Sequence, residues 1–230
     1  MVIPKKIEGK QVTSIGSSAF SPVGNSYIYP YDTTRGKNGQ YYGATYVKQP
    51  VESIIIPEGV ETIGEKAFYY SEITEVIIPK TVTSIGDKAF YACLLEKVEL
   101  PESLEKINSY TFTYNQLTNI TIPSSVKEIG SCAFRNNQLS SIAISEGVEE
   151  IGSWAFENNQ LTNVTIPLSV KRIGIYAFAN NSLSSVKIEG KKNTSEFNYI
   201  STSAFEWSSD VTCNKNNTEY DKNGCIVWEE

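Results

Sequence analysis

The chain has 230 residues, of which 40% are hydrophobic, and it carries a formal net charge of -6 with a sequence pI of about 5.0. This composition suits one domain with a core or one elongated repeat array, whereas the acidic balance argues against a nucleic-acid partner, and no apolar run reaches the roughly 18 residues of a membrane-spanning helix. The chain has no histidine and no Cys-x-x-Cys pair, so it lacks the commonest general base, the Ser-His and Cys-His nucleophile pairs and the usual zinc ligands.

Residues 1–20 contain the first copy of a motif that recurs along the chain. Its form is Ile-Gly-x-x-Ala-Phe, and the first copy, which ends at Phe20, matches it fully. A looser copy, with Asn108 in place of the glycine, ends at Phe112. The first unit is atypical because it carries extra residues at 5–11, and terminal repeats are expected to deviate since one side of them faces water. The start at Met1 lacks the apolar core of a signal peptide. Because the repeat pattern begins almost at once, we expect that an export signal preceded it and has been removed.

Residues 21–50 break the period and are rich in tyrosine. The motif phenylalanines on either side of this segment lie more than two repeat lengths apart, so the interval holds two periods of chain but only one clear motif. Residues 27–29 and 41–47 are predicted to form strands, and Asn38-Gly39 between them is a hairpin turn signal. The six tyrosines of the segment are Tyr27, Tyr29, Tyr31, Tyr41, Tyr42 and Tyr46.

These tyrosines make the segment our first candidate for binding a partner. Tyrosine supplies rigid, amphipathic contact area at a small entropic cost, and loops carried on a rigid scaffold are common binding elements. The alternative is an N-terminal cap whose rings only shield the first coils.

Residues 51–188 form the regular array. The motif phenylalanine recurs at every twenty-second position of this stretch, at Phe68, Phe90, Phe112, Phe134, Phe156 and Phe178. A fixed period in the twenties is typical of a solenoid. Each unit opens with apolar residues at i, i+3 and i+5, such as Leu139, Ile142 and Ile144, whose last two members alternate with an outward residue as in a short strand. A proline ends the strand in most units.

The rest of each unit predicts a shared core. The motif alanine and phenylalanine are expected to point inward, and the motif glycine is expected to occupy a tight turn with positive φ. One coil offers about seven apolar positions, which it cannot bury alone, so the coils must stack into one continuous core.

A polar residue stands three positions after the phenylalanine in the middle of the array. This position holds Asn115, Asn137, Asn159 and Asn181, with Cys93 in the same register. A buried asparagine can hydrogen-bond backbone groups of adjacent coils that would otherwise be unsatisfied. We therefore assign Cys93 a structural rather than a reactive role.

Residues 189–230 are predicted to close the array. A polar insertion at 189–199 precedes a degenerate motif that ends at Phe205, and residues 220–227 contain an Asn-Gly turn and a last strand. This end would cover the open core. Cys213 and Cys225 either form a disulfide or remain reduced, because their spacing does not decide between the two.

Two faces of the array offer outward side chains. On the strand face, one column runs Ser53, Glu75, Lys97, Asn119, Ser141, Asn163 and Ser185, and the other runs Ile55, Ile77, Glu99, Thr121, Ala143, Thr165 and Lys187. Glu75, Lys97 and Glu99 are candidate binding residues, although the face lacks the Trp, Tyr and Arg anchors that interfaces favour and is otherwise a solvated sheet surface. The turn side carries aromatic columns, which are either a contact patch or coil-to-coil packing; they contain Tyr110, Trp154 and Tyr176, then Tyr69 and Tyr91, then Tyr70 and Tyr114.

The repeat as a whole resembles the BspA-like class of leucine-rich repeats, also known from treponemal proteins. The pattern that carries the likeness is Leu139-x-x-Ile142-x-Ile144, followed by Val148-x-x-Ile151-Gly152-x-x-Ala155-Phe156-x-x-Asn159. Asparagine or cysteine at the last position is typical of leucine-rich repeats. The resemblance implies a right-handed solenoid with a parallel sheet on one face and short turns, 3-10 or one-turn helices on the other. Ser145 and Glu189 depart from it at the proline position, and Asn108 departs from it at the glycine position.

The same resemblance implies an exported protein displayed on a bacterial surface that binds other proteins, with no shared catalytic residue and no cofactor. We therefore expect a non-enzymatic protein-binding module, outside the cell or on its surface, that does not insert into the membrane. The first alternative is a structural spacer that holds another domain away from the envelope. The second is a carbohydrate-binding or carbohydrate-active protein, for which pairs such as Glu149-Glu150 supply carboxylates but no evident cleft.

Overall fold

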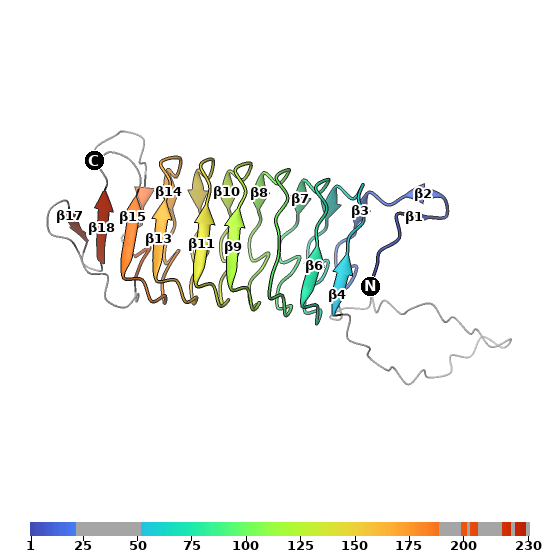
Figure 1. The fold of residues 1–230 in the computed structure, drawn as a ribbon, viewed down its shortest axis with the longest axis horizontal. Helices are drawn as coiled ribbons and strands as arrows, with labels where there is room; N and C mark the ends of the chain where they lie inside the picture. Colours follow the sequence, from blue (N-terminus) through green and yellow to red (C-terminus); the bar gives the residue numbers. More distant parts are fainter. Residues whose placement is uncertain (22–51, 189–198, 202, 207–217, 222–223, 229–230) are drawn as a thin grey trace.

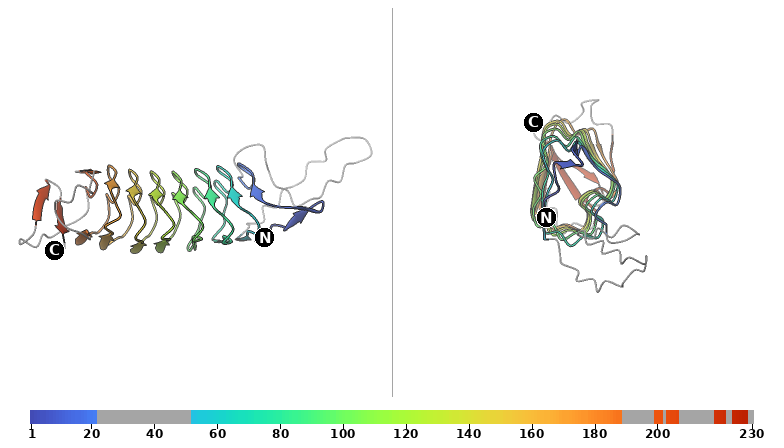
Figure 2. Two further views of the ribbon diagram at one scale, coloured as in Figure 1. Left: turned by 90° about the horizontal axis from the view of Figure 1, so that it is seen from above. Right: turned by 90° about the vertical axis from the view of Figure 1, so that its right-hand side faces the viewer.

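Stacked coils build an elongated solenoid in the computed structural model, which describes residues 1–21, 52–188, 199–201, 203–206, 218–221 and 224–228 (Figure 1). Viewed along the long axis, the coils superimpose around one interior (Figure 2). The strand face carries β4 (Ser53–Ile55), β6 (Glu75–Ile77), β9 (Asn119–Ile122), β11 (Ser141–Ile144), β13 (Asn163–Ile166) and β15 (Ser185–Ile188). A second face carries β3 (Ser14–Ile15), β5 (Thr62–Ile63), β7 (Ser84–Ile85), β8 (Lys106–Ile107), β10 (Glu128–Ile129), β12 (Glu150–Ile151), β14 (Arg172–Ile173) and β16 (Tyr199–Ile200).

The coils pair in parallel and keep the register of the sequence repeat. On the strand face, Asn119 pairs with Ser141, and on the second face Glu128 pairs with Glu150, so each residue meets its equivalent in the next repeat. The parallel solenoid predicted from the period is therefore confirmed. At the N-terminal end, β1 (Lys6–Ile7) and β2 (Lys10–Gln11) form an antiparallel hairpin.

The first coil packs directly on the coil that begins at β4. Strand β3 pairs with β5, and the ring of Phe20 stacks on that of Phe68 with centroids 4.9 Å apart. Residues 22–51 therefore connect two adjacent coils. The strands expected at residues 27–29 and 41–47, and the six tyrosines, lie outside the described residues.

A column of phenylalanine rings runs through the core. Successive rings are stacked with centroids 4.9–5.5 Å apart and planes within 9° of parallel, from Phe20 to Phe205. Phe68, Phe90, Phe112, Phe134, Phe156 and Phe178 are completely buried. Burying one such side chain contributes about 1.5–3 kcal/mol, and each aromatic pair adds about 0.5–1.5 kcal/mol.

The motif glycine has a different role from the expected one, because the positive φ predicted for it is absent. Among the described glycines, positive φ occurs at Gly9, Gly59 and Gly147, none of which is a motif glycine. The motif glycine is instead required by close approach of the coils: a Cβ on Gly86 would lie 2.6 Å from the backbone nitrogen of Glu65 in the preceding coil. Contacts that short do not occur, so the sequence keeps glycine there to let the backbones meet.

The segment between the two faces consists of turns, and the described residues contain no helix. The 3-10 or one-turn helices allowed for here are thus absent. The reason is local: in each coil the second residue after the motif glycine adopts a left-handed φ near 56°, as Lys66, Lys88 and Cys132 do. A second left-handed residue follows four positions later, as at Tyr70 and Asn136. Because each left-handed residue reverses the helical sense, no helix can extend through the segment.

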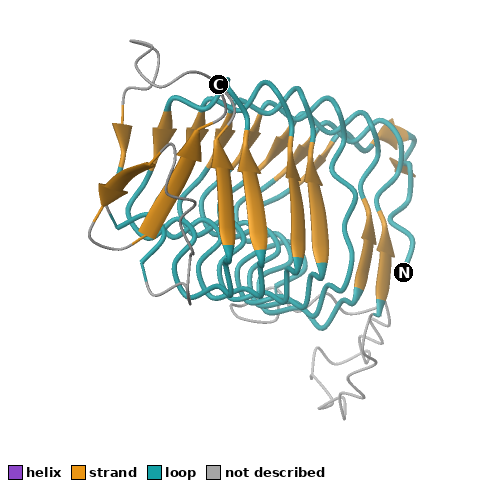
Figure 3. Ribbon diagram, turned by 60° about the vertical axis from the view of Figure 1, so that its left-hand side comes forward, coloured by secondary structure: helices purple, strands orange, loops and turns teal. Residues whose placement is uncertain are grey.

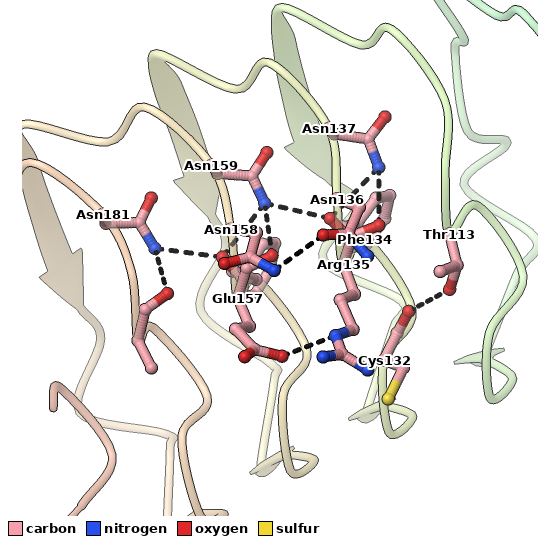
Figure 4. A network of polar contacts seen from close by, with 12 residues as sticks. Thr113, Cys132, Phe134, Arg135, Asn136, Asn137, Glu157, Asn158, Asn159 and Asn181 are labelled. Carbon is pink, nitrogen blue, oxygen red and sulfur yellow. Dashed lines mark hydrogen bonds and ion pairs between the residues drawn. The ribbon is translucent and has the colours of Figure 1, made fainter. Parts of the chain in front are cut away.

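Buried asparagines join neighbouring coils through their side chains. The Nδ2 of Asn137 donates to the carbonyl oxygens of Phe112 (2.9 Å) and Phe134 (3.1 Å), and its Oδ1 accepts a hydrogen bond from the Leu117 N–H (3.1 Å). The same contacts recur at Asn115. They recur also at Asn159 and Asn181, whose side chains Figure 4 shows beside Asn137. One side chain therefore satisfies backbone groups of two coils in the dry interior.

At the C-terminal end, β17 (Thr218–Asp221) and β18 (Gly224–Trp228) form an antiparallel hairpin. Strand β18 pairs in parallel with β15, so this hairpin continues the strand face. Cys213 lies outside the described residues.

Substituting Asn137 by alanine should lower the free energy of unfolding by about 2–4 kcal/mol, since it strands buried backbone groups that each cost about 1–3 kcal/mol when unsatisfied. Chemical denaturation of purified protein measures this. The exposed neighbour Gln138, changed to alanine, is the control and should shift stability by less than about 0.5 kcal/mol. Equal effects of the two changes would contradict the role of the buried amide.

Candidate interaction surfaces

An apolar patch lies at the N-terminal end of the strand face. Ile55 and Ile77 pair with each other in register on β4 and β6, and Val2 forms a parallel bridge with Ile55. Their exposed fractions are 66% for Val2, 41% for Ile55 and 52% for Ile77. We call these three residues the apolar patch. Extensive groups of exposed apolar side chains mark the contact surfaces of proteins, and these three aliphatic side chains form such a group on a small scale.

The three charged candidates adjoin this patch. Glu75 lies on β6, two residues before Ile77 on the same face of the strand. Its backbone forms an isolated parallel β-bridge with Lys97 in the following coil. The Nζ of Lys97 is 2.6 Å from Oε1 of Glu99. This hydrogen bond and the opposite charge lower the pKa of Glu99 and raise the pKa of Lys97. Both groups are fully exposed, so the pair shapes the charge of the surface rather than the stability of the fold.

Beyond Glu99 the strand face becomes small and polar. Its outward residues include Asn119, Thr121, Ser141, Asn163 and Thr165, all exposed. The apolar patch and the charged residues thus distinguish the N-terminal half of the face from the C-terminal half.

Tyrosines gather on the turn side of the early coils. Tyr69 and Tyr91 stack with centroids 5.0 Å apart, and Tyr70 meets both edge-on at 4.6 and 5.7 Å. Tyr114 meets Tyr91 edge-on at 5.5 Å. Burial raises the pKa of Tyr69 and of Tyr91, whereas Tyr70 and Tyr114 remain 47% and 50% exposed. The cluster therefore combines an inner packed pair with two outer rings that face water.

The next aromatic column makes different contacts. The Nζ of Lys88 lies 5.2 Å from the centroid of the Tyr110 ring, and a hydrogen bond with Cys132 raises the pKa of Tyr110. Trp154 and Tyr176 pack with centroids 6.1 Å apart. Each of these rings contacts a side chain of a neighbouring coil.

Sequence reasoning missed a largely buried ion pair on the same side. The Nε of Arg135 lies 2.5 Å from Oε2 of Glu157, whose side chain is almost fully buried (Figure 4). These residues hold the position that Tyr69 and Tyr91 hold in earlier coils, directly after the phenylalanine. The sequence does contain a signal for this ion pair. Arg135 and Glu157 carry opposite charges at equivalent positions of successive repeats, and the repeat period places such positions side by side.

Cys93 occupies the asparagine register of its coil. Its Sγ donates to the Phe68 carbonyl at 3.1 Å and lies 3.3 Å from Oγ of Ser71. Burial raises the pKa of the Cys93 thiol to about 12, so the thiol stays protonated at neutral pH and is a poor nucleophile. Unlike an asparagine, it offers no oxygen to the Ile73 N–H.

The carboxylates considered for catalysis pair with the next coil. Oε2 of Glu149 lies 2.8 Å from Nζ of Lys171, and Oε1 of Glu150 lies 3.6 Å from Nη1 of Arg172. Within the described part of the chain, no group of acidic and cysteine side chains is arranged to hold a metal ion. Nor do those residues include a helix long and apolar enough to cross a bilayer.

Comparison with known sequences matches this repeat to one family. The profile described as the BspA type leucine rich repeat region (6 copies) matches residues 41–158 and 105–223. The chain belongs to this family. Comparison with curated proteins gives no significant match.

Solved structures of bacterial leucine-rich repeat proteins share the fold. A leucine-rich cell-surface protein of Faecalibacterium prausnitzii A2-165 is 25% identical with a TM-score of 0.61, over 81% of this chain and 46% of the other. A leucine-rich repeat protein of Bacteroides ovatus is 27% identical with a TM-score of 0.58, over 82% and 42% of the two chains. The leucine-rich repeat protein of T. pallidum, 24% identical, gives a TM-score of 0.57 over 78% and 74%. The chain thus spans less than half the length of the first two proteins, and its fold is one that suits protein interaction or a structural role.

Cys93 should make stability depend on alkaline pH. Because burial favours the protonated thiol, the Cys93 thiol contributes to the free energy of unfolding in full below its ordinary pKa of 9.0. This contribution is lost as the pH rises toward the pKa of about 12 in the folded protein. Cys93→Asn should reduce the fall in Tm across this alkaline range, and at neutral pH it should raise Tm by supplying an acceptor to Ile73. Thermal melts of both proteins from neutral to alkaline pH measure the difference. The tyrosines with raised pKa titrate in both proteins, so a steeper alkaline fall in the variant would contradict the assignment.

Tyr114 tests whether the outer tyrosines serve coil packing. Its φ of 56° is left-handed, and the equivalent residues of later coils are Asn136, Asn158 and Asn180. Asparagine tolerates this conformation better than tyrosine, which offsets the lost ring contact with Tyr91, worth about 0.5–1.5 kcal/mol. Tyr114→Asn should therefore change the unfolding free energy by less than about 1 kcal/mol.

The inner ring supplies the comparison for that experiment. Tyr91→Ala removes contacts with three tyrosines from a half-buried position and should cost about 1.5–3 kcal/mol, since each ring pair contributes about 0.5–1.5 kcal/mol. A similar loss from Tyr114→Asn in urea denaturation would assign the outer rings to packing.

Proposed function

We propose that this chain is a non-enzymatic protein-binding module of an exported or cell-surface bacterial protein. The observation that carries the proposal is the apolar patch of Val2, Ile55 and Ile77, which adjoins Glu75, Lys97 and Glu99 on the strand face. Exposed aliphatic area beside charged side chains fits a protein surface, since the first supplies burial and the second supplies specificity.

The position of the tyrosine-rich segment supports the same surface. Residues 22–51 rejoin the array directly before β4, the strand that carries Ile55. We propose that Tyr27, Tyr29, Tyr31, Tyr41, Tyr42 and Tyr46 extend the binding surface from there. The membership in a family with cell-surface relatives supports the proposed location, outside the cell or on its surface.

A structural spacer is the second candidate. It is favoured by the uniform small polar surface of β9, β11 and β13 and by the ion pairs that join successive coils on the second face, such as Lys106–Glu128. A spacer needs no partner at Ile55 and Ile77, so the two roles make different predictions for this patch.

The decisive variant is Ile55→Thr with Ile77→Thr, since threonine is the residue of the same column at Thr121 and Thr165. Immobilised fibronectin, laminin and collagen and a panel of surface glycans are the probes, and surface plasmon resonance is the measurement. For a protein probe that the unaltered chain binds, the double variant should weaken binding at least tenfold, because it removes the exposed aliphatic area. Deletion of residues 24–46 should weaken it further.

Ile175→Thr is the matched control, because Ile175 is similarly exposed, at 42%, on the turn segment of a distant coil. It should leave binding unchanged. Equal binding by the double variant and the unaltered chain would remove the apolar patch from the proposal. Failure of the chain to bind any protein probe would favour the spacer.

A further inference from the structure

One junction between the described coils lacks a strand ladder on the second face and keeps a single bridge on the strand face. On the second face, β7 pairs only with β5 and β8 only with β10, so the ladder stops between Ile85 and Ile107. On the strand face, the coil of residues 97–100 forms no strand and keeps only the bridge between Glu75 and Lys97 (Figure 3). The strand face is also interrupted between β11 and β13, but there the second face continues from β12 to β14.

The cause lies in the one full coil of the array without a motif glycine. Asn108 holds the position of Gly86 and Gly130. A Cβ on Gly130 would lie 2.7 Å from the backbone nitrogen of Ser109, and one on Gly86 would lie 2.6 Å from that of Glu65. Asn108 carries a side chain at a position where the regular junctions leave little room for a Cβ. Ser201 also carries one in the last coil and still donates its backbone N–H to Ile173 O at 3.0 Å, so the longer Asn108 side chain, and not its Cβ alone, distinguishes this junction.

Two backbone hydrogen bonds disappear at this junction. At the next junction the Gly130 N–H donates to Ile107 O (2.7 Å) and the Lys127 N–H donates to Glu105 O (2.8 Å). Among the described residues, the equivalent bonds from Asn108 and Glu105 to the preceding coil are missing. The side chain takes over one of them, since Nδ2 of Asn108 donates to Ile85 O at 2.6 Å.

The turn segment keeps its hydrogen bonds across the same junction. The N–H groups of Lys88, Phe90 and Ala92 donate to the carbonyls of Ser109, Thr111 and Thr113 at 2.9–3.1 Å. The phenylalanine stack also continues across the junction, with 5.5 Å between the Phe90 and Phe112 centroids against 5.4 Å at the next junction. At the start of the strand face, the N–H groups of Leu94 and Glu96 still donate to Ile73 O (3.0 Å) and Thr74 O (3.1 Å). The two coils are therefore joined along the turn segment and at the adjoining start of the strand face, and they are least joined along the second face.

We propose that this junction is a hinge built into the array, opened by the side chain of Asn108, whose amide replaces its backbone N–H at Ile85 O. The turn segment forms the axis, and the coils on either side move as two blocks. Because Glu75 and Ile77 lie on one block and Lys97 and Glu99 on the other, movement at the hinge changes the spacing of the charged residues on the strand face. This inference depends on the coil geometry and not on the proposed function.

Hydrogen exchange of the intact chain, followed by mass spectrometry with corrected intrinsic rates, tests the hinge. Protection at residues 105–108 should be at least tenfold lower than at the equivalent residues 127–130, because their backbone bonds across the junction are missing. Protection at residues 109–113, on the axis, should be normal. Equal protection at 105–108 and 127–130 would overturn the proposal.

Two variants test the role of the Asn108 side chain. Asn108→Gly removes it entirely, so it should raise protection at 105–108 to the level of 127–130 and raise Tm. Asn108→Ala keeps the Cβ and removes the amide, and because Ser201 accommodates a Cβ at this position, it should also raise protection at 105–108, to a smaller extent. If neither change raises protection there, the Asn108 side chain does not cause the opening.

A third variant moves the hinge. Gly130→Asn places the same side chain at the next junction, and it should lower protection at residues 127–130 while leaving 149–152 unchanged. If Gly130→Asn prevents folding, the Asn108→Gly and Asn108→Ala variants still decide the question. Unchanged protection at 127–130 in a folded Gly130→Asn protein would contradict the proposal.

Discussion

The fold depends on contact between identical positions of successive coils. A single coil contains short strands with unpaired backbone groups and a set of aliphatic and aromatic side chains that it cannot enclose. The neighbouring coil supplies the missing partner for both: Asn119 pairs with Ser141 on the strand face, and the ring of Phe134 covers that of Phe156 at 5.3 Å. Because backbone pairing and ring stacking repeat at nearly the same short distance, one spacing satisfies both interactions.

This constraint also decides which positions can vary. The motif glycine cannot carry a side chain in a regular junction, and the buried asparagine cannot lose its amide without stranding backbone groups of two coils. Outward positions have no such requirement, so the strand face changes from Ile55 and Ile77 to threonine and asparagine without a change of fold. Function can therefore be altered along the array one column at a time while the interior stays constant.

Much of this architecture could be predicted from the sequence, because the fixed period translates directly into stacking. The direction of the phenylalanines and the parallel pairing follow from it. The period could not reveal how near the coils come, so it left open whether the glycine served a turn or a close approach. It also could not show the left-handed residues at Lys66 and Tyr70, since lysine and tyrosine have no preference for that conformation. Arg135 and Glu157 were missed because charges are normally placed on a solvated surface.

Departures from the repeat are informative because the regular coils show which contacts each position normally makes. Cys93 keeps the donor that an asparagine would provide to the preceding carbonyl and loses the acceptor. Asn108 loses a backbone hydrogen bond and provides a side-chain donor to the same carbonyl of Ile85. In both cases the substituted side chain replaces one of the hydrogen bonds that the regular repeat makes. The hydrogen bond that stays unmade affects a single junction between coils. A solenoid can therefore contain a weak junction without losing its order, since each coil contacts only its neighbours and the defect is not passed along the array.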